Sequence, residues 1–183
     1  MKKVQFITQA AVIAALYVVL TLFANALGLA NYAIQVRFSE ALTILPFFTP
    51  AAIPGLFVGC LISNILGGCI IWDIVFGSLA TLIGAFGTYQ ISLLAHSNRT
   101  SLKAASTEKP VFIYEVCAAI PPIAANTVIV PFVLAYAYKF EGGVPYFMLT
   151  VGIGEVISCG ILGIMLLKVL KKYQHQIFRQ DLA

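Results

Sequence analysis

The sequence predicts an all-α polytopic membrane protein with six transmembrane helices in a single domain over residues 1–183, and three observations support this fold class. Hydrophobic residues make up 61% of the chain and charged residues 10%, whereas a soluble domain has about 25% charged residues. The hydrophobic residues form long runs, and a membrane-spanning helix needs roughly 20 of them. The basic residues are concentrated in short polar segments. A soluble fold is therefore excluded.

The first helix is expected at 4–26. The chain starts with Met-Lys-Lys, as a signal peptide does, but the apolar run continues for about 20 residues to Ala26 and no convincing cleavage site follows it. We therefore expect this segment to remain as a transmembrane helix.

The second and third helices are expected at 37–48 and 51–66. The block from Pro46 to Pro54 between them contains three prolines, which interrupt the backbone hydrogen-bond ladder because proline has no N–H group. Both helices are short for a full span. We expect them to tilt little or to be partly shielded by protein, because unpaired backbone groups cannot face lipid.

The remaining helices are expected at 73–95, 111–138 and 145–170. Residues 96–110 form a polar, basic stretch that we expect to be a cytoplasmic loop, and residues 171–183 are expected to be a cytoplasmic tail. The fifth helix contains Pro121, Pro122 and Pro131, which predict kinks or an unwound turn.

The basic residues predict the orientation of the chain. Six crossings place both termini on the same side as the 96–110 loop, and that side then holds most of the lysines and arginines. Basic loops face the cytoplasm, so both termini are expected there. This distribution indicates cytoplasmic flanks next to membrane lipid and not a nucleic-acid surface.

Four ionisable residues occur within or at the ends of apolar segments: Arg37, Glu40, Asp73 and Glu155. Charge is costly there, which makes each of them a candidate functional residue. Arg37 and Glu40 are three residues apart and share one helix face, where they could neutralise each other as an ion pair. In the alternative, Arg37 holds Glu40 in place and leaves one carboxylate oxygen for a ligand.

Glu155 and Asp73 each have a structural and a functional interpretation. Glu155 lies among glycines in the sixth helix, where it could form an interhelical hydrogen bond to Asn126, remain a neutral buried acid, or bind a ligand. We favour ligand binding. Asp73 lies at the outer start of the fourth helix, where a carboxylate is also a good helix N-cap.

Trp72, the single tryptophan, could anchor the chain at the membrane interface or stack on a ligand beside Asp73. An aromatic face next to carboxylates suits a flat, nitrogen-rich cationic heterocycle, because it offers stacking, N–H acceptors and a counter-charge. Further candidate contacts are Tyr32, Tyr136, Tyr138 and Tyr146 as walls, and Asn64 and Asn126 as amide partners.

Small residues mark two packing surfaces. In the third helix they recur every four residues, at Gly55, Gly59, Ser63 and Gly67, a spacing that favours close internal helix packing. The first helix has two overlapping Ala-x-x-x-Ala pairs, and this patch could dock a separate membrane subunit. It consists of Ala10, Ala11, Ala14 and Ala15.

Several classes of function lack their required residues. No P-loop motif is present, so the chain has no ATP-binding loop of that type. The histidines, His96 and His175, fall in polar segments, which leaves none within the membrane for a metal site or a Ser–His enzyme. The cysteines lie in apolar runs without a Cys-x-x-Cys pair, as small packing residues do; they are Cys60, Cys69, Cys117 and Cys159. We therefore expect neither an enzyme nor a metal site.

Three stretches closely resemble the QueT family of substrate-binding S components of energy-coupling factor (ECF) transporters, which are assigned to queuosine precursors. They read IQVRFSEALTILP at 34–46, FFTPAAIPGLFVG at 47–59 and WDIVFGSLATLIG at 72–84. The resemblance implies a six-helix subunit of the prokaryotic plasma membrane that captures a vitamin-like solute from the outer face. Its implied partners are a transmembrane scaffold, met by the alanine patch, and two cytoplasmic ATPases that use the ATP. No cofactor is implied in this chain.

The resemblance also suggests a ligand. Queuosine precursors such as preQ1 and queuine are 7-deazaguanines with a cationic arm, which combines N–H donors with positive charge. Glu40 or Glu155 would accept the guanine-edge protons, Asp73 or the remaining acid would pair with the amine, and Trp72 or a tyrosine would stack. The alternatives are an S component for another vitamin, a proton-coupled carrier with Glu155 as the proton site, and an intramembrane enzyme without a convincing nucleophile.

Overall fold

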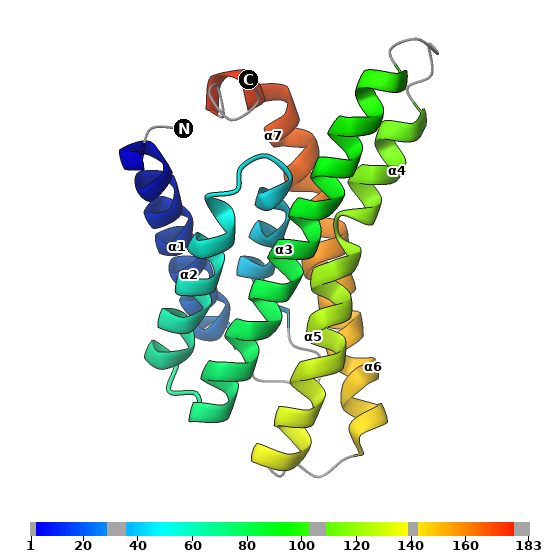
Figure 1. Cartoon of the computed structure of the whole chain (residues 1–183). Helices are drawn as coiled ribbons and strands as arrows, with labels where there is room; N and C mark the ends of the chain where they lie inside the picture. Colours follow the sequence, from blue (N-terminus) through cyan, green and yellow to red (C-terminus); the bar gives the residue numbers. More distant parts are fainter. Residues whose placement is uncertain (1–2, 29–35, 103–108, 139–142, 178–183) are drawn as a thin grey trace.

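The computed structural model describes residues 3–28, 36–102, 109–138 and 143–177, and every regular element within them is helical (Figure 1). The elements in chain order are α1 Lys3–Ala26, η1 Phe38–Phe47, α2 Ala52–Leu66, α3 Ile71–Leu102, α4 Lys109–Cys117, α5 Ile120–Phe132, η2 Val133–Ala137, α6 Val144–Glu155, η3 Val156–Leu162 and α7 Gly163–Ile177. The prediction of an all-α membrane fold is confirmed at this level.

Four of these helical segments are long and apolar enough to cross a membrane: Lys3–Ala26, Ile71–Ser97, Ile113–Ala137 and Val144–Gln174. The two shorter apolar helices, η1 and α2, are the segments whose shortness the prolines predict. Together they make six apolar segments in the expected order. The number of crossings and the cytoplasmic side stay predictions.

The short helix η1 lies inside the bundle and contacts α1, α2, α3, η3 and α7. It is a 3₁₀ helix of 10 residues, and each residue from Ser39 to Pro46 is buried. Long 3₁₀ runs are uncommon, and Pro46, which cannot donate a backbone hydrogen bond, lies near the end of this one. The protein therefore shields this segment on all sides.

Two helices extend beyond the ends expected from the sequence. Helix α3 continues past residue 95 to Leu102, and α4 already begins at Lys109, so the described residues of the expected 96–110 loop are helical. Helix α7 continues past residue 170 to Ile177. Neither extension contains glycine or proline, and polarity alone does not end a helix.

Proline interrupts the fifth apolar segment as predicted. A break separates α4 from α5 immediately before Pro121 and Pro122, and the π-helical turn η2 begins two residues after Pro131. Because proline removes an N–H donor and crowds the preceding turn, the helix changes its hydrogen-bond pattern at these points.

Glycines allow α1 and α2 to pack closely. A Cβ atom at Gly55 would lie 2.7 Å from the Ala10 carbonyl oxygen, and one at Gly59 would lie 3.0 Å from the Ala14 carbonyl oxygen. These contacts fit internal packing of the small-residue strip, as its spacing predicts. They also place Ala10 and Ala14 on the inner face of α1.

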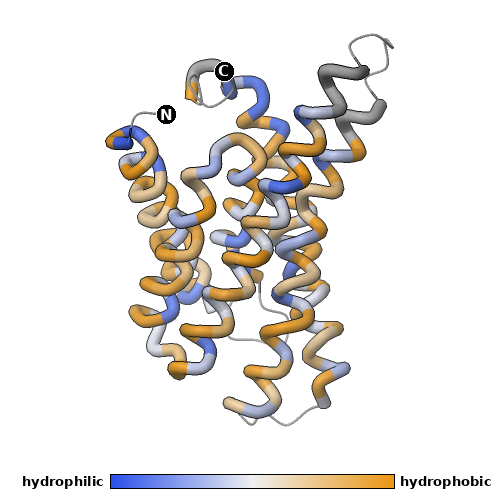
Figure 2. Tube along the Cα trace, in the orientation of Figure 1, coloured by the Kyte–Doolittle hydropathy of each residue, from blue (hydrophilic) through white to orange (hydrophobic). Residues whose placement is uncertain are grey.

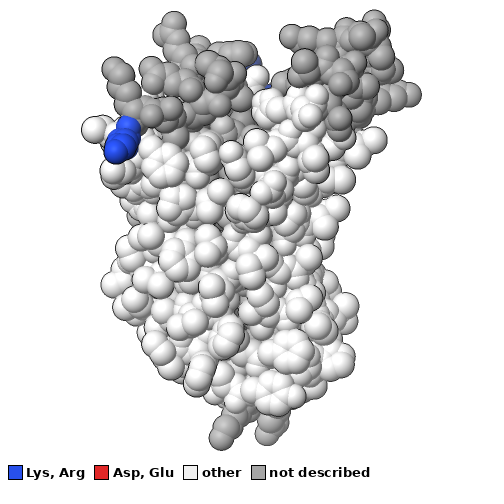
Figure 3. Space-filling view, viewed as in Figure 1, with Lys and Arg blue, Asp and Glu red and all other residues white. Residues whose placement is uncertain are grey.

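The outer surface of the bundle is apolar. Large hydrophobic side chains are exposed on the long helices, among them Val19, Ile83, Val128 and Met165, and Figure 2 shows hydrophobic residues along these helices and hydrophilic ones at the end of α7. On the face shown in Figure 3, basic atoms of the described residues lie at one end and no acidic atom is visible. That end also holds the start of α1, the end of α7 and the adjoining ends of α3 and α4 (Figure 1). Such a surface fits a lipid environment.

Candidate ligand-binding site

A polar site lies within the bundle where η1, α3, α5 and α6 meet. The residues that line it are Arg37, Glu40, Gly77, Thr81, Asn126, Val130, Val151 and Glu155. Glu40 is 2% exposed, Asn126 4% and Glu155 8%. The site encloses a volume of about 10 Å³, so the polar side chains are in contact and an organic ligand needs the site to widen.

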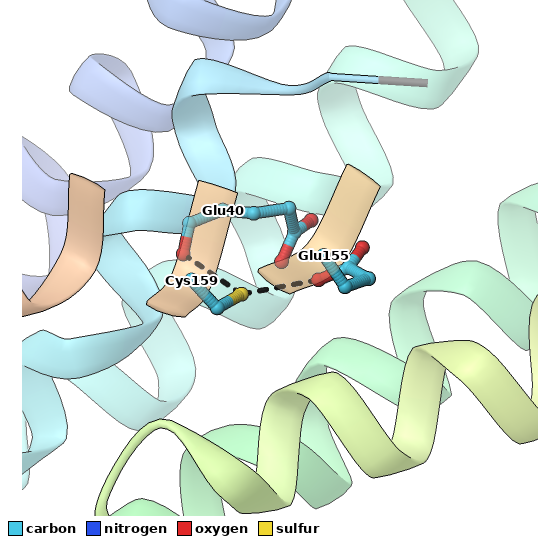
Figure 4. Close-up of side chains that lie close together, drawn as sticks. All are labelled: Glu40, Glu155 and Cys159. Atoms are coloured by element: carbon cyan, nitrogen blue, oxygen red, sulfur yellow. Dashed lines mark hydrogen bonds between the residues drawn. The ribbon is translucent and has the colours of Figure 1, made fainter. Parts of the chain in front are cut away.

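Glu40, Glu155 and Cys159 form one compact cluster in the site. Oxygen atoms of Glu40 and Glu155 and the Cys159 sulfur all lie within 4.8 Å of one another, and Figure 4 shows both carboxylates on the same side of the thiol. The thiol donates to Glu155 Oε2 at 3.0 Å and to the Glu40 carbonyl oxygen at 3.4 Å. Cys159 is thus a polar contact of the site as well as a small buried residue.

Glu40 receives two further side-chain hydrogen bonds. The Tyr17 hydroxyl donates to Oε1, and the Asn126 amide donates to Oε2 at 3.4 Å. The sequence predicts Asn126 as a hydrogen-bond partner of Glu155; the hydrogen bond of its amide is to Glu40, and Asn126 lines the site together with Glu155. Tyr17 is a site residue that the sequence pattern does not mark. The available signal is chemical, because a buried tyrosine hydroxyl usually needs a partner.

Arg37 lines the same site just before η1 begins. It shares this lining with Glu40 and Glu155. Among the described residues, Lys171 and Glu115 form an ion pair within 4.0 Å, whereas the expected pair between Arg37 and Glu40 is not formed. Arg37 therefore lines the site with Glu40 and Glu155 but forms no ion pair with any acid that the structure describes.

Asp73 borders the site from the first turn of α3. Since α3 begins at Ile71, Asp73 is not its N-cap, and the Tyr138 hydroxyl donates to Asp73 Oδ2 at 3.2 Å. A Cβ atom at Gly77 would lie 3.4 Å from Asp73 Oδ1 and 3.2 Å from Asn64 Nδ2. Asp73 and Asn64 thus adjoin the site across Gly77, which lines it.

Three aromatic candidates lie outside this polar site. Trp72 is 57% exposed, Tyr136 72% and Tyr146 51%. Trp72 and Tyr136 instead line a separate apolar groove of about 660 Å³ between α3 and α5. In that groove Trp72 stacks on Phe76 and Tyr136 on Phe132. Tyr32 lies outside the described residues.

The alanine patch is divided between two faces of α1. Ala14 is buried and Ala10 is partly buried against α2, whereas Ala11 and Ala15 are exposed. The outward face of α1 that a partner could contact therefore contains Ala11 and Ala15.

The cluster offers hydrogen bonds more readily than metal ligands. Glu40, Glu155 and Cys159 are close enough to share an ion, but hard carboxylates and a soft thiolate favour different metals. The thiol also uses its proton in the bond to Glu155. The arrangement suits a polar organic ligand with several N–H donors.

Comparisons with known proteins give the family. No solved structure matches the chain. Among curated proteins, the queuosine precursor transporter QueT of Lactococcus lactis subsp. cremoris (strain MG1363) is 39% identical over 74 residues, which cover 40% of this chain and 43% of that protein. The aligned stretch is thus less than half of the relative. The model of the QueT transporter family matches residues 7–172, and the chain therefore belongs to the QueT transporter family.

Proposed function

We propose that this chain is the substrate-capturing membrane subunit of an ATP-driven ECF importer and that it binds a queuosine precursor, a 7-deazaguanine such as preQ1 or queuine, from the outer face. The observation that carries the proposal is the convergence of Glu40, Asn126 and Glu155 in one site inside the bundle. Two buried carboxylates that share one neighbouring arginine are costly to keep. A ligand that supplies N–H donors and positive charge offsets this cost.

The chemistry of the site matches a 7-deazaguanine edge. The two glutamates offer acceptor oxygens for adjacent ring and amino N–H groups, and the Asn126 amide can donate to the ring carbonyl. Val130 and Val151 line the site and can act as apolar walls for the ring. Asp73, next to the site across Gly77, is the proposed partner of the cationic arm.

The proposed importer needs separate subunits for ATP hydrolysis, since this chain has no P-loop motif. The outward pair Ala11 and Ala15 is the proposed contact with the transmembrane scaffold. Small side chains let helix backbones approach closely, which favours association of helices in a membrane.

Ligand binding to the purified chain tests the substrate. Calorimetric titration would compare 7-aminomethyl-7-deazaguanine with riboflavin, thiamine and biotin. Tight binding of the first compound alone is expected. Equal or tighter binding of another vitamin would contradict the substrate assignment.

Uptake into proteoliposomes tests the energy source. The proposal expects no uptake by this chain alone, and uptake when the scaffold, both ATPases and ATP are added. Uptake driven by a pH gradient without these additions would instead establish the proton-coupled carrier.

Substitutions at two neighbouring alanines distinguish a docking defect from a folding defect. Ala15→Leu on the exposed face is expected to abolish ATP-dependent uptake and to leave ligand affinity unchanged. Ala14→Leu is the matched control, since Ala14 is 8% exposed and packs against Gly59; it should lower the amount of folded protein. Normal uptake by Ala15→Leu would remove the docking assignment.

A further inference from the structure

Arg37 is the basic residue among the side chains that line the polar site. It is partly buried, and its backbone is extended, with φ −108° and ψ 111°, immediately before η1. The 10 Å³ left in the site means that Arg37 and its neighbours fill the space themselves. Arg37 is thus part of the wall of the site.

Acidic residues outnumber basic ones around Arg37. Glu40, Glu155 and Asp73 are each less than 9% exposed, and Arg37 carries the positive charge next to them. Charges away from water are costly unless an opposite charge is near. Arg37 shares the lining of the site with Glu40 and Glu155, so it is the positive charge nearest at hand for these acids when no ligand is bound.

Among the described residues, no acid forms a close ionic contact with Arg37. In the part of the chain that the structure describes, no ion pair within 4.0 Å joins it to an acid, whereas Lys171 and Glu115 form one. Its flexible side chain ends in a planar group with several N–H donors. The N–H edge of a 2-amino-pyrimidinone ring and a cationic amine present the same combination of donors and charge.

We propose that Arg37 is a built-in occupant of the ligand site, which compensates the acids when the site is empty and is exchanged for the ligand's N–H donors and positive charge when it is filled. The identity of that ligand rests on the proposed function, whereas the occupancy by a guanidinium group does not. The exchange selects for cationic ligands, because a neutral ligand that displaced Arg37 would leave the buried acids without a counter-charge.

Chemical rescue tests the occupancy without any queuosine precursor. Arg37→Ala should lower the melting temperature of the ligand-free protein in detergent, and millimolar guanidinium chloride should restore much of the loss. Wild type and the control Lys172→Ala, which removes an exposed lysine, should show no such gain. An unchanged melting temperature in Arg37→Ala, or the same response to guanidinium in all three proteins, would overturn the proposal.

A charge-retaining variant covers the case in which Arg37→Ala does not fold. Arg37→Lys keeps the counter-charge and should fold with a melting temperature close to that of wild type, while Arg37→Gln should melt lower. Equal stability of these two variants would also contradict a role for the charge.

Ligand affinity tests the exchange. Arg37→Gln should bind cationic 7-aminomethyl-7-deazaguanine several-fold more tightly than wild type, because no internal cation must leave, and should not gain affinity for neutral 7-cyano-7-deazaguanine. An equal loss of affinity for both compounds would show a direct contact of Arg37 with the ligand and overturn the exchange. If wild type binds neither compound, the proposed function fails, and the guanidinium experiment alone decides the occupancy.

Discussion

Helices α3 and α5 border two spaces of opposite character. One is the closed polar site with Glu40, Asn126 and Glu155 around about 10 Å³, and the other is the apolar groove with Trp72 and Tyr136 around about 660 Å³. Volume alone would select the groove, since binding sites are often the largest apolar pocket. In a membrane protein this rule fails, because an outward apolar groove is surrounded by lipid chains.

The two spaces differ for physical reasons. Buried polar groups need hydrogen-bond partners, so without a ligand the polar side chains close on one another. An apolar groove at the surface of a transmembrane bundle has no such requirement. The groove is also a local feature, since α3 and α5 touch elsewhere: a Cβ atom at Gly84 would lie 2.6 Å from Pro122. A closed polar space is therefore the better candidate for ligand capture here.

The largest effect is expected from Glu155→Gln. The amide has the same shape but removes a charge-assisted acceptor, so affinity for 7-aminomethyl-7-deazaguanine should fall by roughly 1–3 kcal/mol. The melting temperature should not fall, because the substitution removes one of several buried acids that share a single positive charge, and an excess buried carboxylate does not stabilise the empty protein. Titration and thermal denaturation of the same sample measure both quantities.

Glu115→Gln is the matched control, because Glu115 is also a buried acid but is paired with Lys171. It should lower stability and leave ligand affinity unchanged. Unchanged affinity in Glu155→Gln would instead assign Glu155 to structure.

A smaller effect is expected from Asp73→Asn. If Asp73 pairs with the cationic arm, affinity for the aminomethyl compound should fall by about 1 kcal/mol, while affinity for a ligand without the arm should not change. Tyr138→Phe removes the hydrogen bond to Asp73 Oδ2 and keeps the carboxylate, so it serves as the control. Equal losses for both ligands would place Asp73 outside the arm contact.

Cys159→Ala should have a still smaller effect. The thiol is a weak donor that orients Glu155, so its removal should cost about 0.5 kcal/mol of affinity. Cys159→Ser, which retains a donor, should recover the loss. If alanine and serine weaken binding equally, the packing of the sulfur and not its hydrogen bond is what matters.

The sequence predicts the helical segments better than their ends. Apolar runs and prolines locate η1 and α2 between residues 37 and 66, because both signals act within a few residues. The ends near 95 and 170 are wrong by several residues, since α3 and α7 continue to Leu102 and Ile177. Polar residues mark where a helix leaves an apolar environment, but helix formation itself does not require that environment.

The sequence predicts those site residues that carry a charge within an apolar run. Glu40 and Glu155 stand out because a carboxylate in an apolar run is costly, and the structure brings them together with Arg37. Tyr17 and Cys159 do not stand out, since aromatic and thiol side chains are ordinary in apolar helices. Their roles depend on which face of a helix meets Glu40, and that is decided by tertiary packing.

The smallest effect is expected from the groove, where Phe76→Ala shortens a side chain that is 41% exposed. Affinity for 7-aminomethyl-7-deazaguanine should change by less than about 0.5 kcal/mol, as for surface substitutions away from a site. Phe132→Ala, on the facing wall of the groove, should behave in the same way. A loss in both variants as large as that of Glu155→Gln would mean that the ligand extends between α3 and α5. The two spaces would then be parts of one site, joined once α5 moves away from α3, and Trp72 would return as a stacking candidate.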